Sequence, residues 1–224
     1  MARTSSDSIQ HRYVPGIRGD ADVRYASNGS KGVRWNDAHL SQSPLDRSCG
    51  LHSFLQAAMI LTGIPRRQVM RLSEATRGPL AKLWALARDH YFAGATRQDI
   101  AEYCQCFAPD LYCTSFASSN PARAGKAALA AVTAGHVLLV RFDGPGEWSH
   151  WLTVVGIELS EDGSRVRALL ALDPAASAPW IALSNARLHL DVPTGKALPY
   201  RYFSGEHWLV RLREVVVVAL AQGP

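Results

Sequence analysis

The hydrophobic pattern of this 224-residue chain changes once, near residue 135, and that change limits the folds it can adopt. From 49 to about 135 apolar residues recur at helical spacing. From about 136 to 221, short runs rich in Val and Leu are separated by Gly, Pro, Asp and Ser. Helices followed by strands, instead of helices alternating with strands, indicate an α+β fold. We therefore expect an N-terminal helical part packed on a C-terminal antiparallel β-sheet.

The N-terminal segment differs from the rest of the chain. Residues 1–33 are rich in Ser, Gly, Asp and Arg, which predicts a flexible arm ahead of a single domain at 34–224. The segment lacks the apolar stretch of a secretory signal. We therefore expect a cytoplasmic protein, or one exported without a Sec signal by a specialised secretion system. No apolar run approaches the roughly 18 to 20 residues of a membrane span, so no membrane partner is expected.

Charge and cysteine content exclude two further classes. The formal net charge is +5, but the basic residues are scattered and form no stripe interleaved with aromatic residues. This pattern predicts no nucleic-acid partner. Four cysteines in a chain of this length do not suggest a disulfide framework, so we expect free thiols in a reducing compartment.

Cys49 stands at the start of a segment that predicts a buried helix. The run "CGLHSFLQAAMIL" has apolar residues at helical spacing, and Gly63 ends it. A cysteine in this position is open to two interpretations. It can fill space in the core, since free cysteine is often buried. Alternatively it is a nucleophile, because the positive end of a helix dipole lowers the pKa of a thiol.

A predicted β-hairpin supplies a partner for this thiol. Strands at about 151–159 and 166–172 are joined by the turn "SEDGS". Pairing them brings His150, at the start of the first strand, to within a residue or two of Asp173, at the end of the second. A catalytic histidine needs such a carboxylate to fix its tautomer and orientation. The alternative is that His150 is an ordinary strand-edge residue and that Asp173 caps a turn.

A glutamine precedes the predicted nucleophile helix. Gln42 lies seven residues before Cys49, in the loop that enters the helix. Its side-chain amide can donate a hydrogen bond to the oxyanion that forms when a thiolate attacks a carbonyl group. The backbone N–H of Cys49 would be the second donor.

Three motifs around these residues, taken in their order along the chain, resemble those of the papain-like cysteine peptidases. The motifs are "QSPLDRSCG", "SHWLTVVG" and "LALDP", and the resemblance covers about residues 38–185. It is strongest to the branch that contains the double-glycine leader peptidases of bacteriocin exporters and certain plant-pathogen effector proteases. The run "GLHSFLQ" after the cysteine departs from the small "GPT" run of many relatives.

The resemblance implies a papain-like fold whose nucleophile helix packs on the sheet. It also implies a thiol protease with a Cys49–His150–Asp173 triad, with Gln42 as oxyanion donor, acting on a protein or peptide without a cofactor. A bacterial effector or toxin is one role that it leaves open. The same side chains serve acyl transfer in transglutaminases and phytochelatin synthases, and some papain-like folds are silent binding modules. We favour hydrolysis; the oligomeric state is not predicted.

Other residues compete for these roles. His52 lies one helical turn from Cys49, where we expect it beside the thiol's own helix and not across a cleft from it. His136 and His207 also begin predicted strands, but neither is followed by a strand that ends in Asp-Pro. The remaining candidate bases are His39, His90 and His189, and His11 lies in the arm.

Three cysteines outside this motif raise the question of a metal site. Cys104, Cys106 and Cys113 form "CQCFAPDLYC", in which the first pair is separated by one residue. A zinc site favours Cys-x₂₋₄-Cys spacing and needs a fourth ligand. We interpret the three as structural cysteines and expect no metal.

Overall fold

The structure is a computed structural model that describes residues 9–19, 23–29, 32–44, 46–179, 182–190 and 197–221. The helices are α1 (Cys49–Thr62), α2 (Arg66–Val69), α3 (Gly78–Ala87), α4 (Arg97–Gln105) and α5 (Pro121–Thr133). Short 3-10 turns are η1 (Leu72–Glu74), η2 (Arg88–His90) and η3 (Pro145–Glu147). The strands are β1 (Gln10–Tyr13), β2 (Ile17–Gly19), β3 (Val23–Gly29), β4 (Gly32–Asp37), β5 (Leu111–Ala117), β6 (Val137–Asp143), β7 (Ser149–Leu159), β8 (Val166–Leu172), β9 (Ala186–His189), β10 (Tyr200–Phe203) and β11 (His207–Leu220).

Six strands form a closed antiparallel barrel. The ring runs β7, β6, β11, β10, β9 and β8, and β8 pairs with β7 to close it. Two further strands lie outside the ring: β1 pairs with the end of β7, and β5 pairs with the second half of β11. Strands β2, β3 and β4 form a separate antiparallel sheet. Closure satisfies the backbone groups that an open sheet would leave at its edges.

The expected fold class is therefore wrong. An N-terminal helical part packed on a C-terminal sheet, as in a papain-like fold, was expected, but the chain has few helices and a closed barrel with extra strands. The ring is closed through β9 and β10, which have four residues each. Segments this short have too few alternating apolar and polar residues to be recognised as strands in the sequence. Strand β5 also lies inside the stretch 49–135 that was expected to be helical.

The expected flexible arm also differs from the structure. Strand β1 pairs with β7 over four residues, and the Val14 N–H continues the contact by donating to the Val155 carbonyl at 2.9 Å. Strands β2 and β3 also fall within 1–33. Residues 1–8 of that arm lie outside the described residues. Much of the described part of the arm is thus β-sheet.

Several local expectations are confirmed. Helix α1 begins at Cys49 and ends at Gly63, which has a φ of 69° and donates its N–H to the Met59 carbonyl. Strands β7 and β8 form the predicted hairpin. These features depend on local sequence, which is why they could be predicted.

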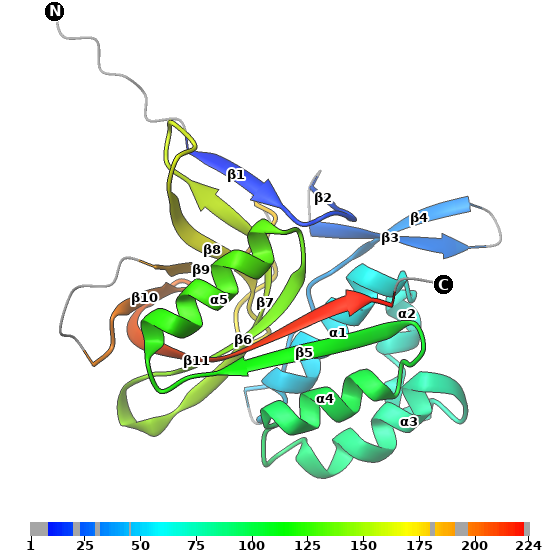
Figure 1. The fold of residues 1–224 in the computed structure, drawn as a ribbon. Helices are drawn as coiled ribbons and strands as arrows, with labels where there is room; N and C mark the ends of the chain where they lie inside the picture. Colours follow the sequence, from blue (N-terminus) through cyan, green and yellow to red (C-terminus); the bar gives the residue numbers. More distant parts are fainter. Residues whose placement is uncertain are drawn as a thin grey trace, which may run out of the picture.

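Helices cover the barrel on more than one side (Figure 1). Helix α1 packs against β6, β7 and β11, and Figure 1 shows it gathered with α2, α3 and α4. Helix α5 lies across β6, β7 and β11 in front of them. Two buried hydrogen bonds fix α1 on β7: Ser53 Oγ donates to the Trp151 carbonyl at 3.1 Å, and Thr153 Oγ1 donates to the Ser53 carbonyl at 2.8 Å. The start of α1 is thereby held beside the start of β7.

Within the described part of the chain, no helix is both long and apolar enough to span a bilayer.

The contact between α5 and β10 provides a test of the packing. A Cβ atom added at Gly125 would overlap the Tyr200 hydroxyl, which donates to the Pro121 carbonyl at 2.7 Å. Gly→Ala normally stabilises a helix by up to about 1 kcal/mol. Here we expect Gly125→Ala to destabilise the protein by about 1–3 kcal/mol, as in other overpacked sites.

The measurement is urea unfolding of Gly125→Ala, Tyr200→Phe and the double variant. Removing the hydroxyl relieves the overlap, so the double variant should be more stable than the sum of the single changes predicts. Additive changes would show that α5 does not rest on Tyr200 in this way.

Candidate active site

The barrel and α1 bring a thiol and an imidazole together. Cys49 is the first residue of α1 and His150 is the second residue of β7. Both are buried, each with 8% of its surface exposed. The Cys49 thiol and the His150 ring lie close enough for each to shift the pKa of the other. The Ser53 contacts with β7 keep the two elements in this relation.

Asp173 completes the cluster from the end of β8. Its Oδ1 lies 2.6 Å from His150 Nε2. Leu172 pairs with Thr153, so Asp173 follows directly at the end of the hairpin where His150 lies. Because Nε2 is occupied by the carboxylate, Nδ1 is the ring nitrogen left for the thiol. Three of the four predicted site residues therefore lie together.

The hydrogen bonds shift the pKa values of the pair in opposite directions. Burial raises the pKa of Cys49, but the His150 contact and backbone N–H groups of Trp151 and Gly50 outweigh it and lower that pKa. Burial lowers the pKa of His150, but hydrogen bonds to Asp173 and Cys49 outweigh it and raise the pKa to about 10. Both shifts favour a thiolate beside an imidazolium.

The Asp173 carboxylate has two further hydrogen-bond donors. Tyr202 donates its hydroxyl to Oδ2, and the Ala175 N–H donates to Oδ1 at 2.8 Å. Burial raises the pKa of Asp173, but hydrogen bonds from His150 and Tyr202 outweigh it and lower that pKa. Tyr202 lies on β10, which pairs with neither β7 nor β8, so this contact crosses the barrel. No local motif in the sequence indicated Tyr202.

The backbone of Asp173 is also held. The Asn185 side chain accepts from its N–H at 2.7 Å and donates to its carbonyl at 2.9 Å. His39 Nε2 donates to the same carbonyl at 2.8 Å. Sequence reasoning missed Asn185 and considered His39 only as a rival base, not as a residue that holds the backbone of Asp173. His39 is 134 positions from Asp173, and no pattern in the sequence links them.

Gln42 lies near this cluster but is not bonded to it through its side chain. Its backbone N–H donates to the carbonyl of Pro174, next to Asp173, at 2.8 Å. Its Oε1 is buried and has no hydrogen-bond partner among the described residues. A buried polar atom without a partner is unusual, because most such atoms are hydrogen-bonded to protein or to ordered water. The predicted role of Gln42 as oxyanion donor stays a prediction.

Asp46 organises the loop between Gln42 and Cys49. Its Oδ2 accepts the Ser43 N–H at 3.0 Å, and its Oδ1 accepts both the N–H and the hydroxyl of Ser48, at 3.0 and 2.5 Å. Ser48 Oγ in turn lies 2.8 Å from His52 Nδ1. The rival base His52 is therefore engaged with Ser48 on its own helix.

The remaining cysteines are free thiols outside this cluster. Cys104 and Cys113 are hydrogen-bonded to each other, which lowers the pKa of Cys113 to about 7 and raises that of Cys104. Burial raises the pKa of Cys106. In the described part of the chain, no group of three or more His, Cys, Asp or Glu side chains is arranged to hold a metal ion.

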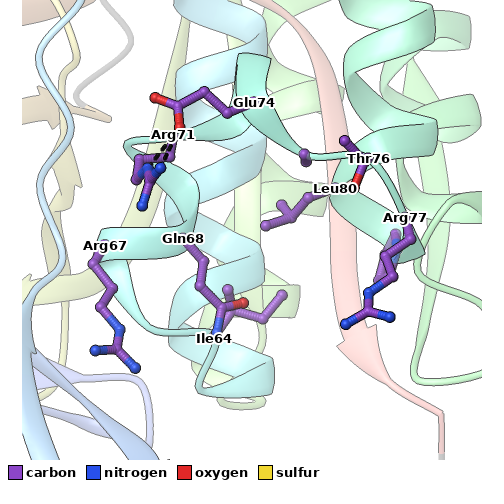
Figure 2. A pocket seen from close by; sticks show the side chains of 10 residues that line it. Ile64, Arg67, Gln68, Arg71, Glu74, Thr76, Arg77 and Leu80 are labelled. Atoms are coloured by element: carbon purple, nitrogen blue, oxygen red, sulfur yellow. Dashed lines mark hydrogen bonds and ion pairs between the residues drawn. The ribbon is translucent and has the colours of Figure 1, made fainter.

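A pocket of about 550 Å³ lies away from these residues, between α2, η1 and the start of α3 (Figure 2). Figure 2 shows Arg67 and Arg77 on either side of Gln68, and Arg71 paired with Glu74 at 2.5 Å. None of the four predicted site residues lines it.

Comparison with known proteins adds no family. No protein-family model matches this chain, and a search of curated proteins finds no similar sequence. Any inference about function therefore depends on the geometry of the residues and on the motifs in the sequence.

The opposite pKa shifts predict an unusually reactive thiol. The thiolate is the nucleophile, so Cys49 should react at lower pH than an ordinary thiol, and the ion pair should persist until His150 loses its proton near pH 10. At pH 6, iodoacetamide should label Cys49 well before Cys104 and Cys106, whose pKa values are raised. Cys113, whose pKa is also lowered, is the stricter comparison and should still react more slowly than Cys49. Peptide mapping by mass spectrometry would measure the labelling of each cysteine.

Asp173→Asn is the matched variant, because it is nearly isosteric and removes the charge that stabilises the imidazolium. It should reduce the labelling of Cys49 at pH 6 and leave the other three cysteines unchanged. Equal labelling of all four in the unaltered protein would contradict an activated thiol.

Proposed function

We propose that the protein is a cysteine peptidase that hydrolyses a peptide or amide bond in a protein or peptide substrate. The observation that supports this most directly is the grouping of Cys49, His150 and Asp173, in which Asp173 is hydrogen-bonded to His150, the thiol pKa is lowered and the imidazole pKa is raised. The proposal rests on this arrangement and on the motif resemblance to papain-like peptidases. It does not rest on a shared fold.

In the acylation step, the Cys49 thiolate attacks the carbonyl carbon of the scissile bond and a C–S bond forms. The imidazolium of His150 gives its Nδ1 proton to the leaving nitrogen, the C–N bond breaks and an amine departs. Asp173 keeps the His150 ring oriented and stabilises its charged form. The enzyme is left as a thioester with a neutral His150.

In the deacylation step, neutral His150 accepts a proton from a water molecule that attacks the thioester carbonyl. The C–S bond breaks, a carboxylic acid is released and the thiolate–imidazolium pair is restored. Each step passes through an oxyanion. The Cys49 N–H, one of the first N–H groups of α1 that have no partner within the helix, and the Gln42 amide are the proposed donors to it.

The catalytic pair should behave as one unit. Cys49→Ala and His150→Ala should each abolish hydrolysis, and the double variant should be no slower than either single variant. The assay is cleavage of a proteome-derived peptide mixture followed by mass spectrometry in H₂¹⁸O. Incorporation of ¹⁸O at new C-termini indicates hydrolysis, whereas transfer to an added amine indicates acyl transfer. If His150→Ala kept more than about a tenth of the rate, a residue other than His150 would have to be the general base.

Gln42 should affect turnover and not thiol reactivity. Gln42→Ala removes one proposed oxyanion donor and should lower kcat by about 10²–10³. Labelling of Cys49 at pH 6 should stay unchanged, since Gln42 makes no hydrogen bond to the thiol. The control variant is Gln68→Ala, because Gln68 is an exposed residue of α2. It should leave both kcat and the labelling of Cys49 unaltered. Normal turnover by Gln42→Ala would show that Gln42 is not an oxyanion donor.

A further inference from the structure

A second pocket lies directly beside the helix that carries Cys49. Its volume is about 390 Å³. It is lined by residues of α1, of the loop before α1 and of the α2–η1 segment, with aromatic residues from α3 and the loop that follows η2: Leu40, Ser41, Ser43, Leu51, His52, Leu55, Val69, Met70, Leu72, Ser73, Trp84 and Tyr91. We call it the uncharged pocket, because none of these residues is an acid, a lysine or an arginine.

The two segments that line the uncharged pocket are those that carry the proposed catalytic groups. Ser41 and Ser43 flank Gln42 on either side in sequence. His52 lies three residues after Cys49 on α1, a spacing that brings side chains to within about 5–6 Å of one another at Cβ. The pocket therefore begins within about one helical turn of the thiol.

The lining favours an apolar occupant. Leu51, Leu55 and Val69 contribute aliphatic surface, and the rings of Trp84 and Tyr91 meet edge to face with their centres 6.4 Å apart. His52 is hydrogen-bonded to Ser48, and burial lowers its pKa, so it is neutral at pH 7. Apolar pockets with a few polar groups are the usual form of a ligand site.

The rim of the pocket supports the same conclusion. Met70 lines it and is 63% exposed, so its side chain can contact an occupant that enters from solvent. On the other side of the α2–η1 segment, the pocket in Figure 2 carries Arg67, Arg71 and Arg77. The two pockets thus differ sharply in charge, and only the uncharged one adjoins the loop of Gln42.

We propose that the uncharged pocket binds an apolar side chain of the substrate close to the scissile bond and so sets the specificity of cleavage. This inference rests on the proposed function of Cys49. An occupant with a charged end would have to leave that charge without a partner among the lining residues, which costs free energy. The pocket should therefore select aliphatic or aromatic side chains against acidic and basic ones.

The test uses three reagents that differ only in their tails: iodoacetamide, N-benzyl-iodoacetamide and N-(2-carboxyethyl)-iodoacetamide. Rate constants for Cys49 are divided by those for N-acetylcysteine, which corrects for intrinsic reactivity. The benzyl reagent should gain about tenfold over iodoacetamide at Cys49, and the carboxyethyl reagent should gain nothing. No gain for the benzyl tail would overturn the proposal.

Two variants locate the effect. Met70→Glu places a charge on the rim and should remove most of the benzyl gain while leaving the rate with iodoacetamide unchanged. Leu209→Glu is the matched control: Leu209 is 45% exposed and does not line the uncharged pocket, so the gain should persist. Equal losses in the two variants would contradict the proposed location.

A failure of the proposed function can be distinguished from a failure of the pocket proposal. If Cys49 does not react with iodoacetamide at pH 6, the pocket can still be examined with N-benzylacetamide, the unreactive analogue, in Cys49→Ala protein. Methyl NMR signals of Leu55, Val69 and Met70 should shift on binding. Absence of shifts there would refute the pocket independently of catalysis.

Discussion

The hydrogen bond between Asp173 and His150 is the interaction on which the rest of the site depends. At 2.6 Å it fixes which ring nitrogen faces Cys49 and favours the charged form of the ring. Each larger feature of the fold contributes to it. The β7–β8 hairpin brings the two residues to one end, the closed barrel places Tyr202 against the carboxylate, and the Ser53 hydrogen bonds hold α1 beside β7. The hairpin, the barrel and α1 thus all help to hold this one hydrogen bond in place.

Burying these charges has a cost that the hydrogen bonds must offset. A buried carboxylate without partners is strongly unfavourable, and Asp173 has donors from His150, Tyr202 and Ala175. The lowered pKa of Asp173 stabilises the fold above the ordinary carboxyl pKa, and this contribution is lost as the pH falls through the folded value. The raised pKa of His150 contributes stability at low pH that is lost as the pH rises toward about 10. Between these limits both contributions favour the folded state.

The part of the site that could be predicted is the part encoded locally. The pairing of His150 with Asp173 follows from the length of one hairpin, and the ends of α1 from Cys49 and Gly63. Tyr202 could not be predicted, because its contact depends on closure of the barrel through two four-residue strands. The same long-range closure explains why the expected fold class was wrong. The pairing of β1 with β7 was missed for a related reason, since a four-residue strand in a polar segment has little hydrophobic pattern.

The central claim is that His150 is a stable imidazolium held between a thiolate and a carboxylate. The most direct measurement is ¹⁵N NMR of the histidine ring nitrogens as the pH is varied, in the unaltered protein and in Cys49→Ala. The account predicts that both nitrogens of His150 stay protonated at pH 8, with loss of the proton only near pH 10, and that the pKa falls in Cys49→Ala because one of its two hydrogen-bond partners is gone. A neutral His150 ring at pH 8, titrating near the ordinary histidine pKa of about 6.5 in both proteins, would contradict it.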